Sequence, residues 1–411
     1  MNRRIFLKDS ALAMVGIGAA PMWLQRAMYA SDTTAQRKKI LVAIFQRGAA
    51  DGLNIVVPHG EKRYYELRPT LHIPQPTAGT PKEQSVIDLD GLFGFNPALA
   101  PLKSVWDDGH LALIHASGSP DPTRSHFDAQ DYMESGTPGI KSIDGGWMNR
   151  ALLPVTGPES PVRAIALGAS LPRALRGAND AIAIESLRSF QVRDNNAAKI
   201  FENLYLATDD QVLNGTGKET FEAVSILKKV QNTPYTPANG AAYPNGRFGD
   251  SLKQIAQLIK ANVGVEVAFA DYGGWDHHVQ EMNALPNMLR DFGGSLAAFW
   301  NDLGDLRDNV VVVTMSEFGR TAKENGTRGT DHGHANVMFV MGGPVKGGKV
   351  YGKWPGLAEH ELYEKRDLAV TTDFRAVLGE VVSNHIGNKD IIKVFPGYPG
   401  GPQDFRGFLK V

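Results

Sequence analysis

The sequence predicts an α/β protein with one large, mostly parallel sheet flanked by helices and a helical cap insertion. Short apolar runs alternate with longer stretches in which apolar residues recur at helical spacing. The strand-like runs are almost continuously apolar, as expected of strands buried on both faces. Strands that alternate with helices in this way are typical of parallel sheets with helical crossovers.

Each predicted strand is a short run of apolar residues. In chain order they are Lys39–Phe45, Leu111–His115, Val162–Leu167, Val263–Ala270, Val310–Met315 and Val337–Met341. The predicted helices are Ser125–Glu134, Asn195–Ala207, Glu219–Val230, Phe248–Ala261 and Met288–Leu303. Phe248–Ala261 shows the pattern most clearly, because Leu252, Ile255 and Leu258 form one apolar stripe. Since residues 185–245 lack clear strands, we expect the cap insertion there.

The first 30 residues predict export. Arg3 and Arg4 precede Ile-Phe-Leu-Lys, which is the signature of a twin-arginine signal. The apolar stretch 11–24 is too short to span a bilayer comfortably, since spanning needs about 20 apolar residues. We therefore expect a signal peptide over 1–30, recognition by the twin-arginine translocase, and a periplasmic or secreted domain over 31–411. The alternative is an ordinary basic helix. No second segment is apolar and long enough to anchor the mature protein.

Charge and cysteine content exclude two classes of site. The chain has 43 basic and 44 acidic residues, so it carries no electrostatic footprint for nucleic acid. It has no cysteine, which excludes thiolate metal sites and fits an oxidising compartment without disulfides. Any metal must therefore be held by carboxylates and imidazoles.

The loops after the first two long strands carry candidate residues. Asp51 lies in a glycine-flanked turn, where it could bridge metals or simply cap the next segment. Ser125 or Thr123 would lie at a helix N-terminus, which favours a deprotonated hydroxyl, although a plain N-cap serine is the alternative. Arg124 could bind phosphate or sulfate oxygens. His126 is either a ligand or an orienting base.

The later loops carry carboxylates and histidines, and ligands bind at such strand ends in α/β sheets. Asp276 with His278 follows one strand, and Glu317 follows the next. His332 and His334 are two residues apart, so in an extended segment both could reach one centre. This ligand set suits zinc, manganese or iron. We expect one or two divalent ions, with zinc, manganese and calcium as the candidates.

Five motifs together resemble the domain of unknown function 1501 family. They are Arg47–Leu53, Arg124–Gln130, Gly274–His278, Ser316–Arg320 and Asp331–Asn336, in matching order and spacing along nearly the whole mature chain. Members of that family often carry a twin-arginine signal, and the family resembles the alkaline phosphatase and sulfatase superfamily in fold. The resemblance implies a large α/β domain with two divalent metals at the carboxyl ends of the strands.

The resemblance also implies roles for particular residues. A first-strand aspartate, a hydroxyl nucleophile, an aspartate–histidine pair, a later acid and a final histidine assemble the superfamily site. Carried over, these roles fall on Asp51, Ser125 or Thr123, Asp276 with His278, Glu317, and His332 or His334. Two positions depart from the pattern. Phe318 stands where the superfamily usually has a histidine, and His277 stands where the family more often has a small hydroxyl residue.

These observations predict an exported metal-dependent hydrolase of phosphate or sulfate esters, acting on a small-molecule or glycan ester. A hydroxyl or a metal-bound water would attack, and Arg124 or Arg320 would neutralise charge on the equatorial oxygens. One alternative is a non-catalytic exported binding or assembly protein with a degenerate metal site, which Phe318 favours. Another is a periplasmic oxidoreductase, which the lack of a dinucleotide fingerprint, cysteine cluster or haem motif argues against.

Overall fold

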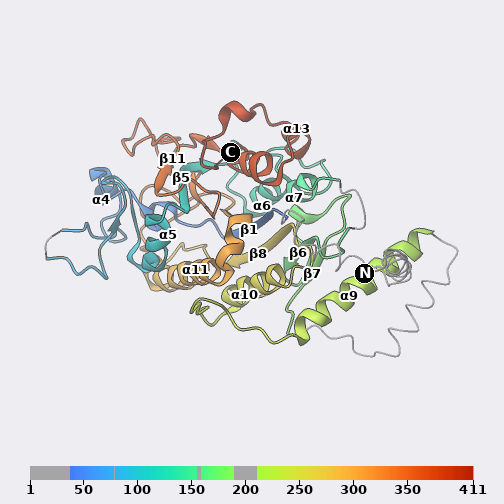
Figure 1. Ribbon diagram of the computed structural model, residues 1–411. Helices are drawn as coiled ribbons and strands as arrows, with labels where there is room; N and C mark the ends of the chain where they lie inside the picture. The colour runs from blue at the N-terminus through green and yellow to red at the C-terminus, as the bar shows by residue number, and fades with distance from the viewer. Residues whose placement is uncertain (1–37, 78, 155–158, 189–210, 411) are drawn as a thin grey trace, which may run out of the picture.

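A single sheet of nine strands forms the centre of the molecule (Figure 1). The computed structural model describes residues 38–77, 79–154, 159–188 and 211–410, with the backbone alone for 211–219. The order of the strands across the sheet is β11 (Lys349–Tyr351), β5 (Leu111–Gly118), β10 (Asn336–Gly342), β9 (Val310–Met315), β1 (Ile40–Arg47), β8 (Val267–Gly273), β6 (Ala164–Leu167) and β7 (Ile182–Ile184). A ninth strand, β12 (Thr372–Asp373), pairs with β5.

The sheet is mostly parallel, as predicted. Only β10 runs against its neighbours, since it pairs antiparallel with both β5 and β9. All the other pairings in this sheet are parallel. Because β10 is reversed, the residues just before it lie at the same edge as the residues just after β1, β5, β8 and β9. One edge of the sheet therefore collects five chain segments.

Helices cover both faces of the sheet, and alternate residues of β1 show the two layers. Val42 and Ile44 pack in the core with α10 (Arg247–Lys260) and α11 (Glu281–Leu303). Leu41 and Ala43 pack on the other face with α7 (Trp147–Ala151) and α12 (Phe374–Val381). Figure 1 shows α10 and α11 below the sheet and α6 and α7 above it. Burial on both faces explains why the strands are almost continuously apolar.

A second, smaller sheet and further helices complete the described part of the chain. A small sheet contains β2 (Val56–Val57), β4 (Gly94–Phe95) and β3 (Ile87–Asp88), which sequence periodicity did not predict. The remaining helices include α3 (Gly52–Ile55), α4 (Lys62–Leu67), α5 (Lys103–Asp107), α6 (His126–Ser135), α9 (Gln211–Asn232), α13 (Ile391–Val394) and the 3₁₀ segments η1 (Pro97–Leu102) and η3 (Gly304–Asn309).

Most predicted elements lie within a few residues of the observed ones. Three boundaries were wrong by more: α9 begins at Gln211, eight residues before the predicted start, α11 begins at Glu281, seven residues before it, and β8 begins at Val267, four residues late. The late start of β8 has a local cause, because Asn262 has a left-handed φ of 50° that turns the chain after α10. The predicted signal peptide, the predicted helix 195–207 and residues 189–210 of the predicted cap lie outside the described residues. The described part of the cap contains α9 and a loop.

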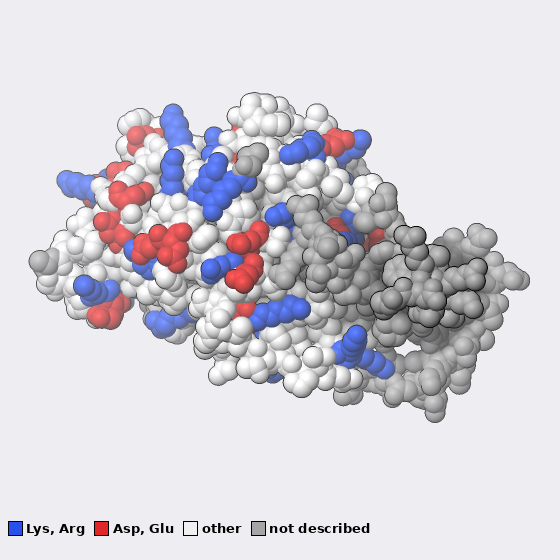
Figure 2. All heavy atoms as spheres, viewed as in Figure 1, with Lys and Arg blue, Asp and Glu red and all other residues white. Residues whose placement is uncertain are grey.

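The described surface gives no sign of a membrane-spanning or strongly cationic segment. None of the helices in the described ranges is long and apolar enough to cross a bilayer. Figure 2 shows lysine and arginine side chains interspersed with aspartate and glutamate over the visible face. This mixture agrees with the near-neutral charge of the sequence.

Candidate metal centre

Three histidines and an aspartate meet at the edge where β5, β8 and β9 end and β10 begins. His126 is the first residue of α6, which follows β5. Asp276 and His278 follow β8, and His332 lies just before β10. The reversed direction of β10 is what brings His332 to this edge. We call these four residues the imidazole cluster.

His332 and Asp276 each lie within 3.0–3.3 Å of the other cluster residues. His332 Nε2 lies 3.0 Å from the Nε2 atoms of both His126 and His278. The Asp276 carboxylate lies 3.3 Å from the Nε2 atoms of His126 and His332. It lies 3.0 Å from His278 Nε2. Their side chains keep between 24% and 43% of their exposure, so solvent and a substrate can reach them.

Each imidazole donates its Nδ1 hydrogen away from the cluster, because the partner atom on that side can only accept. The partner of His126 is Glu317 Oε1 at 2.8 Å, and the partner of His278 is Asp331 Oδ1 at 3.2 Å. His332 donates to the carbonyl oxygen of residue 124 at 2.9 Å. In the neutral tautomers these bonds require, the Nε2 lone pair of His332 faces the Nε2 atoms of both His126 and His278. Lone pairs at 3.0 Å repel unless a cation or a shared proton lies between them.

The cluster has the donors and the spacing of a divalent metal site. Ligands 2.0–2.1 Å from a tetrahedral zinc ion are about 3.3 Å apart, close to the separations observed here. Imidazole nitrogens whose other nitrogen is bonded to a carboxylate or carbonyl are the usual ligands of transition metals. The ligand atoms of His126, Asp276 and His332 all lie within 4.8 Å of one another, close enough for one ion to bind all three. The residues present therefore fit the ion that the sequence predicts.

Glu317 supports the cluster from behind, through His126. Its Oε1 accepts hydrogen bonds at 2.8 Å from the amide of Gly48, from Gln130 Nε2 and from His126 Nδ1. Although burial raises the pKa of Glu317, the bonds from His126 and Gln130 outweigh it, and the pKa is lowered. The same bond to Glu317 raises the pKa of His126. Glu317 is therefore a buried, ionised carboxylate that orients an imidazole.

Phe318 fills the position where a further imidazole was expected. Its ring is 98% buried and its centroid lies 5.0 Å from the ring centroids of both His126 and His332. Ala49 and Ala129 pack against it in the same small core cluster. An apolar ring at this point restricts the rotation of two cluster imidazoles, so its effect here is to hold them in place.

Two glycines bring the loop after β9 against the segment before β10. A Cβ on Gly319 would lie 1.8 Å from the carbonyl oxygen of Ala335, and a Cβ on Gly333 would lie 2.3 Å from the backbone of Arg320. The two segments pair as a short antiparallel bridge between Arg320 and His332. Only residues without a side chain allow this approach, which places His332 beside the end of β9.

Arg320 holds Asp276 and has further donors. Its Nη2 donates to Asp276 Oδ1 at 2.6 Å, while the Nε and Nη1 atoms are buried with no hydrogen-bond partner. Burial raises the pKa of Asp276, but Arg320 and the neighbouring histidines outweigh it and the pKa is lowered. His277 lies beside Arg320, and both its ring nitrogens are buried without a partner. Burial, together with Arg320, lowers the pKa of His277.

Asp51 lies outside the imidazole cluster. Both its oxygens are bonded to the guanidinium of Arg68, one of them at 2.9 Å, and both side chains are fully buried. Glu281 hydrogen-bonds Asp51 from the other side, and burial beside that carboxylate raises the pKa of Glu281 well above its usual value. Despite burial, Arg68 lowers the pKa of Asp51. Asp51 as a metal ligand thus stays a prediction, and Arg68 already neutralises its charge.

The other predicted residues are placed as follows. Ser125 is the N-cap of α6 and its amide donates to Thr123 Oγ1 at 3.3 Å. The guanidinium of Arg124 bonds Asp367 and Glu364. His334 Nε2 bonds the carbonyl of Ser119 at 3.0 Å, away from the cluster. The roles predicted for Ser125, Thr123, Arg124 and His334 also stay predictions. Of the predicted metal ligands, the cluster contains Asp276, His278 and His332.

The structure adds residues that the sequence left open or did not assign. His126 belongs to the cluster, where the sequence allowed either a ligand or a base. Asp331 and Gln130 support His278 and Glu317 respectively. A carboxylate directly followed by an imidazole occurs in both Asp276-His277 and Asp331-His332, and this repetition could have suggested the role of Asp331. Gln130 has no sequence signal beyond its spacing of four residues from His126 on one helix face.

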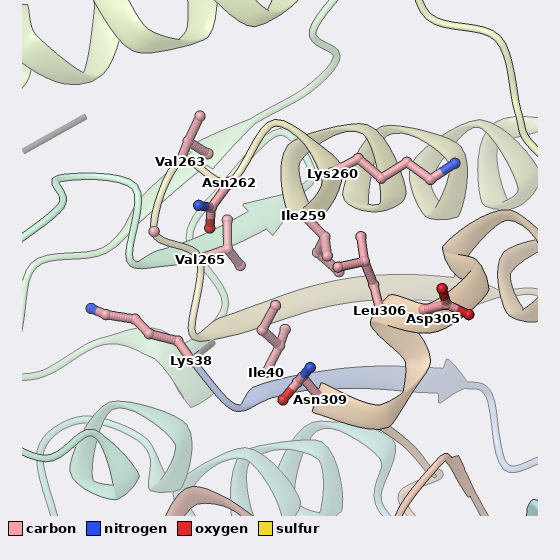
Figure 3. Close-up of a pocket in the computed structure, with 11 residues that line it drawn as sticks. Lys38, Ile40, Ile259, Lys260, Asn262, Val263, Val265, Asp305, Leu306 and Asn309 are labelled. Carbon is pink, nitrogen blue, oxygen red and sulfur yellow. The ribbon is translucent and has the colours of Figure 1, made fainter. Parts of the chain in front are cut away.

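A cavity of about 390 Å³ lies at the opposite edge of the sheet, where β1, β8 and β9 begin (Figure 3). Ile40, Ile259 and Leu306 face one another across it, and the ammonium ends of Lys38 and Lys260 point outward. Both lysines are already paired, with Glu266 and Asp302 respectively. Because the cavity lies at the opposite edge of the sheet, it is separate from the cluster.

Comparison with known proteins identifies a family. The sequence model described as "Protein of unknown function (DUF1501)" matches residues 111–390, which include all four cluster residues. A search of curated proteins found no match.

Several solved structures are similar to the chain at low identity. The alkaline phosphatase of the Antarctic bacterium TAB5 is 12% identical, with 75% of this chain and 93% of that chain covered and a TM-score of 0.29. A protein in the alkaline phosphatase superfamily from Vibrio parahaemolyticus is 8% identical, covering 75% and 60%, with a TM-score of 0.30. A sulfatase from Pseudoalteromonas sp. is 11% identical, covering 95% and 75%, with a TM-score of 0.34.

Proposed function

The chain belongs to the DUF1501 family of proteins of unknown function, and we propose that it is a metal-dependent hydrolase of phosphate or sulfate esters. The observation that carries the proposal is the position of His332 Nε2, which lies 3.0 Å from the Nε2 atoms of His126 and His278, with the Asp276 carboxylate 3.0–3.3 Å from all three rings. His126, Asp276, His278 and His332 would hold the ion. Such an ion would act as a Lewis acid on an ester oxygen and lower the pKa of an attacking hydroxyl.

Arg320 is the residue that favours phosphorus or sulfur as the reaction centre. Its Nη2 fixes Asp276, and its Nε and Nη1 atoms are buried without a hydrogen-bond partner in the described chain. A tetrahedral oxyanion offers oxygens that can accept from such donors, and these gain negative charge during displacement. A guanidinium fixed by a carboxylate needs little reorganisation when that charge develops.

The nucleophile we propose is the Ser125 hydroxyl, with Thr123 as the alternative. Ser125 directly precedes His126 in the chain and is the N-cap residue of α6, where free amide hydrogens favour an oxyanion. Its side chain makes no capping hydrogen bond, and its neighbour His126 is fixed by Glu317.

A non-catalytic binding protein is the second candidate function. The observation that favours it is the position of Arg124, whose guanidinium bonds Asp367 and Glu364 and so does not face the cluster. On this alternative the cluster would hold a structural metal, and recognition would take place on the surrounding loops.

Metal analysis of the purified mature protein, followed by a phosphatase, phosphodiesterase and sulfatase panel, tests the proposal. We expect at least one divalent ion per chain, lost in Asp276→Ala and His332→Ala. His360→Ala, which removes an exposed histidine, is the matched control. Bound metal without turnover on any ester would favour the binding protein. No metal in the parent protein would reject both the cluster assignment and the hydrolase.

We also propose that the protein is exported by the twin-arginine translocase to the periplasm or beyond. The support is the Arg3-Arg4 pair followed by Ile-Phe-Leu-Lys. Because the translocase distinguishes arginine from lysine, Arg3→Lys with Arg4→Lys should keep the protein in the cytoplasm. Cell fractionation measures this, and normal delivery of the double variant would contradict the assignment.

A further inference from the structure

A second cavity adjoins the imidazole cluster, and we call it the lateral cavity. Its volume is about 370 Å³, and Asp331 and Arg366 belong to its wall. Asp331 accepts from His278 Nδ1, and Arg366 Nη2 donates to the carbonyl oxygen of His332 at 2.8 Å. Because both wall residues contact cluster residues, a molecule whose ester group lies at the cluster has room to extend into the lateral cavity.

Cations outnumber carboxylates in the wall. The cations are Arg63, Lys323, Lys365 and Arg366, and the carboxylates are Glu324, Asp331 and Glu359. The Glu324 carboxylate accepts from the amides of Thr70 and Leu71 and from the Thr70 hydroxyl, each at 2.9 Å. Asp331 accepts from Asn325 as well as from His278. Two of the three negative charges are therefore engaged by neutral or imidazole donors of the protein.

Arg366 is engaged by the buried Asp367 carboxylate at 3.6 Å and by the His332 carbonyl, but the other three cations are weakly engaged. Lys323 is exposed and forms no ion pair within the described part of the chain. Lys365 lies 3.3 Å from Glu359, but the two side chains are 75% and 65% exposed, so the pair is weak. Arg63 bonds Glu66 at the surface. The wall thus offers positive charge that an anion from outside can compete for.

The backbone holds one side of the wall in an uncommon conformation. Glu364 and Lys365 have left-handed φ values of 52° and 57°. Tyr363 and Asp367 exchange backbone hydrogen bonds of 2.8 and 3.0 Å across this turn, and Arg124 bonds both Glu364 and Asp367. A strained turn fixed from both ends is typical of a functional loop. Here it places Lys365 and Arg366 in the wall of the lateral cavity.

We propose that the lateral cavity binds a second anionic group of the substrate. The substrate class is then an ester of a molecule that carries a further phosphate, sulfate or carboxylate, such as a multiply charged sugar. This inference rests on the proposed function for the position of the ester group. Lys323 is the residue we assign as the specificity determinant, because it is a wall cation with no partner of its own in the described chain.

Calorimetric titration of the metal-loaded mature protein tests the proposal, and Ser125→Ala serves as the background that prevents turnover. The probes are fructose 1,6-bisphosphate and fructose 6-phosphate, which differ by one phosphate. We expect the bisphosphate to bind at least tenfold more tightly at low salt. Lys323→Ala should reduce that preference about threefold to tenfold, and Lys323→Arg should retain it. Lys62→Ala is the matched control, because Lys62 is 91% exposed next to Arg63 but outside the wall.

Each outcome decides between the two proposals. Equal binding of both probes by the parent, or an equal loss in Lys62→Ala and Lys323→Ala, would overturn the anion subsite. Hydrolysis of simple monoesters with no such preference would keep the proposed function and reject the subsite. A preference that depends on Lys323, in a protein that hydrolyses no ester, would keep the subsite as an anion-binding site and reject the hydrolase.

Discussion

The Nε2 atoms of His126 and His332 lie 3.0 Å apart, although neither has a hydrogen to give the other in the tautomers that their neighbours require. His126 donates through Nδ1 to a carboxylate and His332 donates through Nδ1 to a backbone carbonyl. A divalent ion between the two rings would turn this repulsion into attraction. The supporting residues should therefore control metal affinity.

Glu317→Gln should weaken metal binding without abolishing it. The amide keeps the volume of the side chain but removes the charge that fixes the His126 tautomer. Loss of such a support typically costs 10–100-fold in metal affinity. Competition with a chromophoric chelator measures the effect. Glu380→Gln is the matched control, since Glu380 is equally buried and accepts from the amides of Arg406, Gly407 and Leu409. Equal metal affinities in both variants would show that Glu317 does not act through His126.

Arg320→Lys should lower turnover and leave metal content unchanged. Lysine keeps the positive charge but cannot bond Asp276 and also present two further hydrogens to an oxyanion. Loss of one such donor costs about 10²–10³ in kcat. Arg124→Lys is the comparison, because Arg124 was the other candidate for this role. A larger loss of turnover at residue 124 than at residue 320 would transfer the role to Arg124, and would require its guanidinium to leave Asp367 and Glu364.

Much of this site was visible in the sequence because its residues follow strand ends. Asp276, His278 and Glu317 stand directly after apolar runs, and the carboxyl ends of parallel strands share one edge. The pairing of Asp51 with Arg68 was not predictable, because it depends on how α4 folds back over the loop after β1. His334 was expected beside His332 from the alternation of an extended strand. The segment instead forms an isolated bridge at His332, paired with Arg320, and His334 packs against Tyr363.

Ser125→Ala should abolish ester hydrolysis while metal content and melting temperature stay nearly unchanged. The Ser125 hydroxyl makes no capping hydrogen bond, so its loss should cost less than the roughly 1 kcal/mol of a bonded N-cap, whereas loss of the attacking group removes the covalent route. Thr123→Ala is the control two residues away. Activity lost only in Thr123→Ala would move the nucleophile to that residue. Full activity in both variants would exclude a hydroxyl nucleophile from the protein and leave attack to water.

The buried His115 should make the protein less stable in mild acid. His115 is 98% buried, its Nε2 donates to the carbonyl of Val56 at 3.0 Å, and its Nδ1 accepts from the amide of Ala116 at 2.9 Å. A ring that donates on one side and accepts on the other is neutral. Burial lowers the pKa of His115 to about 4, and an unfolded histidine has a pKa of about 6.5.

The sign of the effect follows from which state binds the proton. Between pH 6.5 and 4 the unfolded chain is protonated at residue 115 and the folded chain is not. The free energy of unfolding therefore falls as the pH falls through this window, by at most about 1.4 kcal/mol per pH unit for one proton. Above the window both states are neutral and the contribution is complete. His115→Gln, which can still donate and accept, should remove this part of the slope. Urea unfolding of the mature parent and variant at pH 7.5, 6 and 5 measures the difference, and two parallel curves would contradict the assignment of a neutral buried His115.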